Sequence, residues 1–391
     1  MKLKKRKIIA LMLAVMMLMA SSAFAVSEGA VVVRGGAESA PVIVVNYTEL
    51  STVAGTAKEM IDNGAMLFIT SPECSAEEIA KELSIPKTNT SLYQDAILVA
   101  YSIYKQGDRY IFANHYVSFA DEVGENESGI STADNIVGSG MFSDVAKVSD
   151  CNAAETAAWE ADGYSRILSA AVTARADNEN FTARISDNPS GISTQGTTLP
   201  GKIADETWND TLSVYNLGNT YCGYLNCTVY AYVMGTGKVN GARMNIYDVV
   251  SVAKAYPNSG SYVDTYKVRI HCNVTDYVCL ETTTLPSGIN LEKSLELSVQ
   301  TDLIGNAGVS TSWSYNPESQ LITESSPYAR VVDWTAKTVS PQLGKAYEMA
   351  PGMRVASPIG VSKGAFSKIT CDGMILGITV KSNSLEVGGW F

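Results

Sequence analysis

The C-terminal half of this chain is constrained most strongly by residue types that belong in strands. From residue 205 onward Tyr, Val, Thr and Ser dominate, and turn signals recur, as at Pro257-Asn258-Ser259-Gly260. Aromatic and β-branched residues favour strands, and regularly spaced turns between such runs are typical of antiparallel sheets. We therefore expect residues 205–391 to form an antiparallel β-sandwich domain.

The most regular alternation lies in residues 294–315. Apolar and polar residues alternate strictly on either side of Gly305. Because successive side chains of a strand point to opposite faces, each half has one apolar and one polar face, and the two halves predict a hairpin. Its apolar face comprises Leu295, Leu297, Val299, Val309, Trp313 and Tyr315, a candidate membrane hairpin.

The segment 38–122 has the pattern of a small α/β domain. Apolar runs at 42–45 and 66–69 predict buried strands, each followed by helical periodicity. Asn63-Gly64 ends the first helix, and Ser75 with Glu78 forms a capping box that opens the second. Two further strands then flank a turn at Lys105-Gln106-Gly107-Asp108.

The stretch 123–204 resembles a linker, since it is rich in Gly, Ser, Asp and Asn. We expect one helix within it, over 152–175, and a loop over 178–204. The expected fold class is therefore α+β: a small N-terminal α/β domain, a helical linker and a C-terminal antiparallel β-sandwich.

The first 25 residues predict a cleavable signal peptide. A basic cluster is followed by an apolar run over 8–20, and Ala23 and Ala25 give the small-x-small pattern of a cleavage site. The run is shorter than the roughly 20 apolar residues of a membrane-spanning helix. We expect cleavage after Ala25 and a secreted, extracellular product.

The charge of the chain restricts its partners. Lys and Arg number 29 and Asp and Glu 40, and the leader holds five of the basic residues and no acidic one, so the mature chain carries about −16. This charge argues against nucleic acid and against electrostatic attraction to anionic lipid. A protein, a glycan or a cell surface remains as the expected partner, and membrane contact stays open.

Seven cysteines fit an oxidising compartment. Four of them form two close pairs in the sequence and are candidate disulfide partners, although the sequence does not choose among the three possible connectivities. A zinc site is the alternative, but zinc ligands are usually spaced by two to four residues. The four candidates are Cys222, Cys227, Cys272 and Cys279.

A candidate surface patch follows from alternation in the segment 266–272. Lys267, Arg269 and His271 fall on the face opposite Val268 and Ile270. The patch is either a solvated strand face or a small anion-binding site. His115, the other histidine of the chain, is expected to be structural.

Catalytic motifs are incomplete in this sequence. Residues 360–364 match the G-x-S-x-G pattern, but no histidine follows Ser362 as the α/β-hydrolase triad requires. Ser251-Val252-Ala253-Lys254 matches a β-lactamase motif, but its companion motifs are missing or out of order. There is no H-E-x-x-H, P-loop or G-x-G-x-x-G, so we expect no catalytic residue, no cofactor and no metal.

The stretch 293–334 resembles secreted bacterial β-rich proteins of the leukocidin or aerolysin pore-forming type. The resemblance rests on the Ser/Thr-rich alternation of residues 309–315 and implies a hairpin able to contact a membrane. Three functions therefore remain open. The first is a non-enzymatic extracellular binding protein, the second a membrane-active pore-forming protein, and the third a secreted hydrolase that uses carboxylates.

Overall fold

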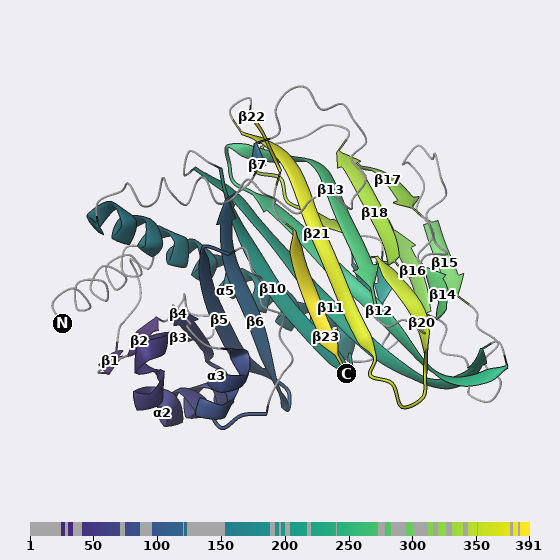
Figure 1. Ribbon diagram of the computed structural model, residues 1–391, viewed down its shortest axis with the longest axis horizontal. Helices are drawn as coiled ribbons and strands as arrows, with labels where there is room; N and C mark the ends of the chain where they lie inside the picture. The colour runs from purple at the N-terminus through teal and green to yellow at the C-terminus, as the bar shows by residue number, and fades with distance from the viewer. Residues whose placement is uncertain are drawn as a thin grey trace.

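The computed structural model describes most of the chain outside the leader and several connecting segments. Within the described residues most positions lie in β-strands, and α2, α3 and α5 are the α-helices (Figure 1). The β-rich character expected from the sequence is confirmed at this level. The described ranges are 25–27, 30–33, 41–70, 75–86, 96–119, 121–122, 153–187, 192–194, 197–199, 204–216, 220–239, 241–272, 278–282, 295–299, 311–315, 320–325, 331–338, 343–349, 351–375, 378–381 and 384–391.

The elements expected in the N-terminal segment are confirmed. Strand β3 (Val42–Asn46) pairs in parallel with β4 (Met66–Thr70), and α2 (Leu50–Asp62) connects them after a short 3-10 turn, η1 (Tyr47–Glu49). Helix α2 ends where Gly64 takes a φ of 92°, a left-handed conformation that favours glycine. The capping box of Ser75 and Glu78 opens α3 (Ala76–Glu82).

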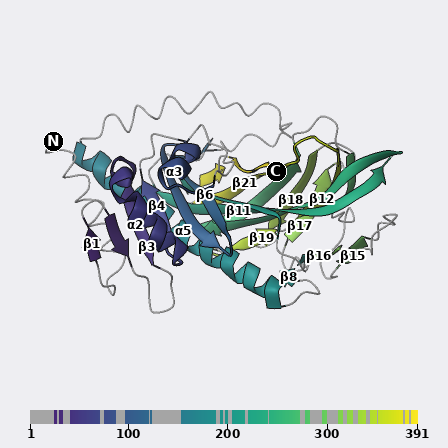
Figure 2. The same ribbon diagram turned by 90° about the horizontal axis from the view of Figure 1, so that it is seen from below.

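This part of the sheet is covered on both faces. Even-numbered residues of β3 and β4, such as Val44 and Phe68, pack in one cluster with α5 (Ala153–Asp187). Odd-numbered residues, such as Ile43 and Leu67, pack in another cluster with α2 and α3. Figure 2 shows α5 running along the sheet. Burial on both faces explains why these strands are continuous apolar runs.

The N-terminal strands continue directly into those of the C-terminal half. Strand β5 (Leu98–Gln106) forms a hairpin with β6 (Arg109–Phe119) through Gly107 and Asp108. Strand β6 then pairs in parallel with β10 (Glu206–Tyr215), with His115 opposite Thr211. The α/β part and the β-rich part therefore share one hydrogen-bonded sheet.

Two main sheets form the β-rich structure of the described residues. The larger has the order β1-β2-β3-β4-β5-β6-β10-β11-β12-β20-β14, with β19 beside β12. The smaller has the order β17-β18-β13-β21-β22-β7, with β23 beside β21. The strands not yet bounded are β1 (Ala25–Ser27), β2 (Ala30–Val33), β7 (Asp121–Glu122), β11 (Tyr221–Val239), β12 (Ala242–Pro257), β13 (Ser261–His271), β14 (Val278–Thr282), β17 (Gln320–Ser325), β18 (Val331–Thr338), β19 (Tyr347–Met349), β20 (Gly352–Pro358), β21 (Gly364–Ile375), β22 (Ile378–Lys381) and β23 (Leu385–Trp390).

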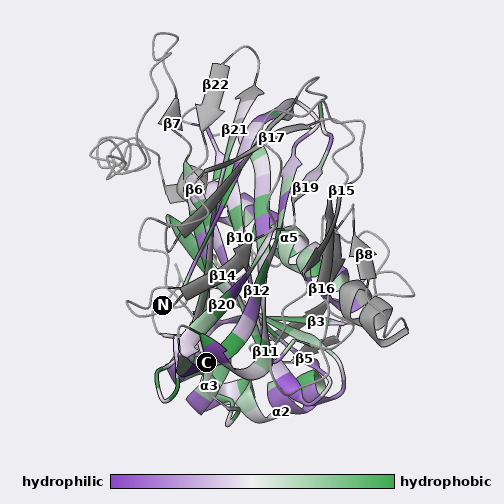
Figure 3. Ribbon diagram, turned by 90° about the vertical axis from the view of Figure 1, so that its right-hand side faces the viewer, coloured by the Kyte–Doolittle hydropathy of each residue, from purple (hydrophilic) through white to green (hydrophobic). Residues whose placement is uncertain are grey.

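The two main sheets share a hydrophobic core. Val229 and Val249 from the larger sheet pack in the same cluster as Val268, Ile369 and Val387 from the smaller one. Figure 3 shows that hydrophobic and hydrophilic positions both occur along these strands. The alternation that the sequence displays after residue 205 thus places apolar side chains between the sheets.

Helix α5 is longer than the sequence pattern predicted. We expected a helix over 152–175 and a loop over 178–204, but α5 continues to Asp187, and the short strands β8 (Ile192–Thr194) and β9 (Thr197–Leu199) follow. Arg175 and Glu179, one turn apart, form an ion pair with a 2.6 Å Nε–Oε1 distance. Asn178 also hydrogen-bonds to Tyr104 and Tyr230 at 2.9 Å, so tertiary contacts outweigh the loop preference of the asparagines. No helix among the described residues is long and apolar enough to cross a membrane.

Candidate functional site

Two strands are described within the expected hairpin segment 294–315, and they pair with each other. Strand β15 (Leu295–Val299) pairs antiparallel with β16 (Thr311–Tyr315). The register sets Leu295 opposite Tyr315 and Leu297 opposite Trp313. Apolar positions thus pair with apolar positions, as the alternation predicted. Val309 lies outside the described residues.

The hairpin forms a sheet of its own. In the part of the chain that the structure describes, β15 and β16 pair with each other and with no strand of the two main sheets. Strand β16 lies against β9, which itself pairs only with β8 among the described strands. A two-stranded hairpin outside a larger sheet is held by few backbone hydrogen bonds beyond its own.

The candidate surface patch lies on β13. Lys267 is exposed and Arg269 and His271 are half-buried, whereas Val268 and Ile270 are buried. His271 stacks on Phe366, with ring centroids 5.3 Å apart, and its Nε2 lies 3.0 Å from Glu386 Oε1. The hydrogen bond to His271 lowers the pKa of Glu386. A carboxylate therefore already faces this patch, and the anion site stays a prediction.

Cys222 and Cys227 are thiols in the structure. The Cys222 thiol donates to the carbonyl of Thr220 over 3.5 Å, and the Cys227 sulfur lies 3.4 Å from Ser251 Oγ. Burial raises the pKa of both thiols to about 12, which keeps them neutral. Cys272 is fully buried, and the side chain of Cys279 lies outside the described residues, so the pairing of the four stays a prediction.

A row of buried polar residues crosses the junction of β5, β6 and β10. The two ring nitrogens of His115 each lie 2.7 Å from a hydroxyl, Nδ1 from Thr211 Oγ1 and Nε2 from Ser102 Oγ. Burial lowers the pKa of His115 to about 3, so the imidazole is neutral and joins three strands. This is the structural role that we expected for His115.

Asp210, beside this row, was not anticipated from the sequence. Its Oδ1 accepts hydrogen bonds from the backbone N–H and the side-chain amide of Asn114, at 2.7 and 2.9 Å. Burial raises the pKa of Asp210, and the two hydrogen bonds from Asn114 offset only part of that rise, so the pKa is about 7. The only sequence signal is a polar run, Asn209-Asp210-Thr211, at consecutive strand positions.

Two catalytic-looking motifs fall at positions without catalytic geometry. On β12, Ser251 is buried with its hydroxyl 2.6 Å from Ser367 Oγ, whereas Lys254 Nζ donates to Asp177 at 2.8 Å. Residues three apart in a strand point to opposite faces, so Lys254 does not reach Ser251. Ser362 lies in an exposed turn between β20 and β21. Among the described residues no cluster of His, Cys, Asp and Glu has the composition of a metal site.

Comparison with known proteins gives partial structural likenesses. No family model and no curated protein sequence matches the chain. A solved pore-forming protein is 9% identical with a TM-score of 0.27, over 42% of this chain and 96% of its own. Clostridium perfringens delta-toxin is 11% identical with a TM-score of 0.28, over 50% and 93%. The Clostridium perfringens NetB toxin, in its membrane inserted form, is 7% identical with a TM-score of 0.24, over 46% and 94%.

These matches are weak and partial likenesses to pore-forming proteins, as the resemblance in the sequence was, and they do not locate it in residues 293–334. TM-scores this low establish no common fold. We accordingly base the function of this chain on its own residues.

Proposed function

We propose that this chain is an exported, membrane-active protein that inserts residues 294–315 into a lipid bilayer as a pore-forming hairpin. The register of β15 and β16 carries the proposal. Its pairs, from Leu295 with Tyr315 to Val299 with Thr311, are all centred on Gly305. Pairing in this register keeps one face of the hairpin apolar and the other polar.

The length of the alternation supports insertion. On each side of Gly305 the sequence offers nine residues, 295–303 and 307–315, in which apolar or Thr positions alternate with polar or Gly positions. A membrane-spanning β-strand needs about 9–11 residues. In such a strand one face meets lipid and the other meets water. Both halves of the segment meet these requirements of length and pattern.

The place of the hairpin in the fold also supports the proposal. Insertion requires the hairpin to leave its position in the soluble protein. Since β15 and β16 share no ladder with the two main sheets among the described strands, their departure leaves the hydrogen bonds of those sheets intact. The conformational change is therefore local, and the shared core of the main sheets persists.

The test is dye release from vesicles of uncharged phosphatidylcholine, because the net charge of about −16 disfavours anionic lipid. Wild-type protein is expected to release the dye. Val299 is at the centre of the segment 295–303 on its apolar face, so Val299→Lys places a charge near the bilayer midplane. Such a charge costs about 2–4 kcal/mol per strand, and release is expected to be lost.

Ser298→Lys is the matched control, since it places the same charge one residue away on the polar face. It is expected to keep dye release near the wild-type level. Circular dichroism checks that both variants are folded. Absence of release with wild-type protein, or equal release with both lysine variants, contradicts the proposal.

We further propose a signal peptide over 1–25, an α/β part over 38–122, a connecting segment with one helix over 123–204 and a β-sandwich over 205–391, with the α/β and sandwich parts sharing one sheet. The core shared by the two main sheets supports the sandwich, and the cluster around α2 and α3 supports the α/β part, on whose other face α5 of the connecting segment packs. N-terminal sequencing of exported protein tests the leader. A mature chain that begins at Val26 is the expected result.

Extracellular binding without membrane insertion is the second candidate function. An apolar pocket between the two sheets favours it, since pockets of this kind hold small ligands. Dye release distinguishes the two candidates, because a pure binding protein leaves vesicles intact.

A further inference from the structure

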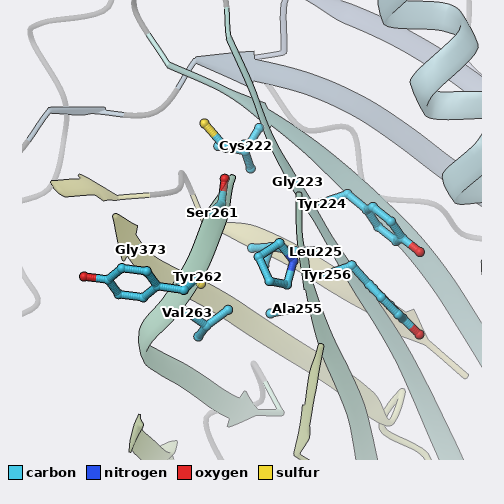
Figure 4. Close-up of a pocket in the computed structure, with 13 residues that line it drawn as sticks. Cys222, Gly223, Tyr224, Leu225, Ala255, Tyr256, Ser261, Tyr262, Val263 and Gly373 are labelled. Carbon is cyan, nitrogen blue, oxygen red and sulfur yellow. The ribbon is translucent and has the colours of Figure 1, made fainter. Parts of the chain in front are cut away.

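A pocket opens where the two main sheets meet, close to the β12–β13 turn (Figure 4). Its volume is about 50 Å³, which is room for a small molecular fragment and not for a drug-sized ligand. Val214, Leu225, Ala255 and Val263 contribute apolar walls, and Cys222 and Ser261 contribute the thiol and the hydroxyl. Among the described residues that line it, none is charged.

Two β-bulges lie beside this space. On β11 the pairing with β10 steps from Tyr221–Tyr215 to Gly223–Val214, so Cys222 is an extra residue. On β13 the pairing with β21 steps from Val263–Gly373 to Thr265–Asp372, so Asp264 is extra. Bulges bend a strand and redirect its side chains, and they occur frequently beside functional sites.

Glycines keep the neighbouring strands close at both bulges. A Cβ on Gly223, whose φ is 139°, would lie 2.2 Å from the carbonyl oxygen of Tyr256. A Cβ on Gly373 would lie 2.3 Å from the carbonyl oxygen of Tyr262. Neither position admits a side chain without a shift of the neighbouring backbone, so glycine is required at both places beside the pocket.

Among the described residues of the protein the Ser261 hydroxyl has no hydrogen-bond partner, which indicates that a ligand group binds beside it. Ser261 is 4% exposed. Its backbone is fixed, because its N–H donates to the carbonyl of Asn258 at 2.8 Å and its carbonyl accepts from Gly344 at 2.9 Å. A buried hydroxyl without a partner is unfavourable, and a bound group that hydrogen-bonds to it removes that penalty.

We infer that this pocket binds a small, uncharged and mainly apolar molecule whose single hydroxyl group pairs with Ser261 Oγ. The apolar walls provide the affinity by removing the molecule from water, and the hydroxyl fixes its orientation. Because none of the described residues that line the pocket is charged, the desolvation cost of an ionic ligand would not be offset by an ion pair, so the pocket favours neutral molecules. This site is separate from the hairpin, and its occupancy is measured without a membrane.

The test compares phenol with benzene, which lacks the hydroxyl, by calorimetric titration and saturation-transfer NMR on the full mature chain. Wild-type protein is expected to bind phenol saturably and more tightly than benzene. Ser261→Ala removes the hydrogen bond, and phenol affinity is expected to fall about 3- to 10-fold while benzene affinity is unchanged. Ser357→Ala, a buried serine on β20, is the control and is expected to bind as wild type does.

Val263→Phe places a ring in the pocket and is expected to abolish binding of both compounds. If this variant does not fold, the preference of the wild-type protein for phenol over benzene still decides the matter. No saturable binding to wild-type protein overturns the inference, and so does equal affinity for the two compounds. Dye release by the hairpin is unaffected by either result, so the two proposals fail independently.

Discussion

Asp210 is the residue at which burial and charge conflict most directly. Its folded-state pKa of about 7 is above its ordinary value of 3.8, so the stability tied to its protonated form is complete at low pH and is lost as pH rises through 7. Asp210→Asn keeps the acceptor oxygen for Asn114 and cannot ionise. We expect this variant to be more stable than wild type, and the stability difference between the two proteins to grow by on the order of 2–3 kcal/mol from pH 5 to pH 8. Urea unfolding at both pH values measures it.

Titration of His115 does not affect this comparison, although its pKa is shifted down whereas that of Asp210 is shifted up. Its folded-state pKa of about 3 is below its ordinary value of 6.5, so its stability is complete above pH 6.5 and is lost on acidification. That loss is common to wild type and Asp210→Asn and cancels in their difference. A stability difference that is the same at both pH values would show that Asp210 does not titrate with a raised pKa.

At the scale of elements, helix α5 connects the two halves of the molecule through Asn178. The Asn178 side-chain amide donates to Tyr104 on β5, and its oxygen accepts from Tyr230 on β11, both at 2.9 Å. Asn178→Ala leaves two buried phenol groups without this partner. We expect a loss of about 2–3 kcal/mol in the free energy of unfolding.

Ser169→Ala is the control for this change, because Ser169 is exposed on the same helix. Its effect is expected to stay within about 0.5 kcal/mol. Urea unfolding of both variants measures the difference. Equal stabilities for Asn178→Ala and Ser169→Ala would mean that the amide does not join the two halves.

Elements with local signals could be predicted from the sequence, and elements that depend on distant contacts could not. The capping box at Ser75, the stop at Gly64 and the register centred on Gly305 all follow from residues close in the sequence. The last turns of α5 depend on Tyr104 and Tyr230, which are more than fifty residues away. The bulges in β11 and β13 beside the pocket have no distinctive local pattern.

At the scale of the whole molecule, the sheet passes without interruption from the α/β part to the β-rich part. The ladder from His115–Thr211 to Phe119–Tyr215 joins them, and the bonds between Asp210 and Asn114 lie beside it. Separate domains on a linker would unfold independently. A shared sheet makes unfolding of one part expose the edge and buried polar groups of the other, so the two parts are expected to unfold together.

Tryptophan fluorescence can measure this coupling, because Trp159 stacks near Phe119 in the cluster around α5, and Trp208 packs near Phe391 in the core of the main sheets. Two proteins, each keeping one of these tryptophans with the others replaced by Phe, report the two parts separately. We expect their urea midpoints to coincide, and Asn178→Ala to lower both by the same amount. Midpoints that separate, or a shift confined to the Trp159 protein, would show that the continuous sheet does not make the two parts one cooperative unit.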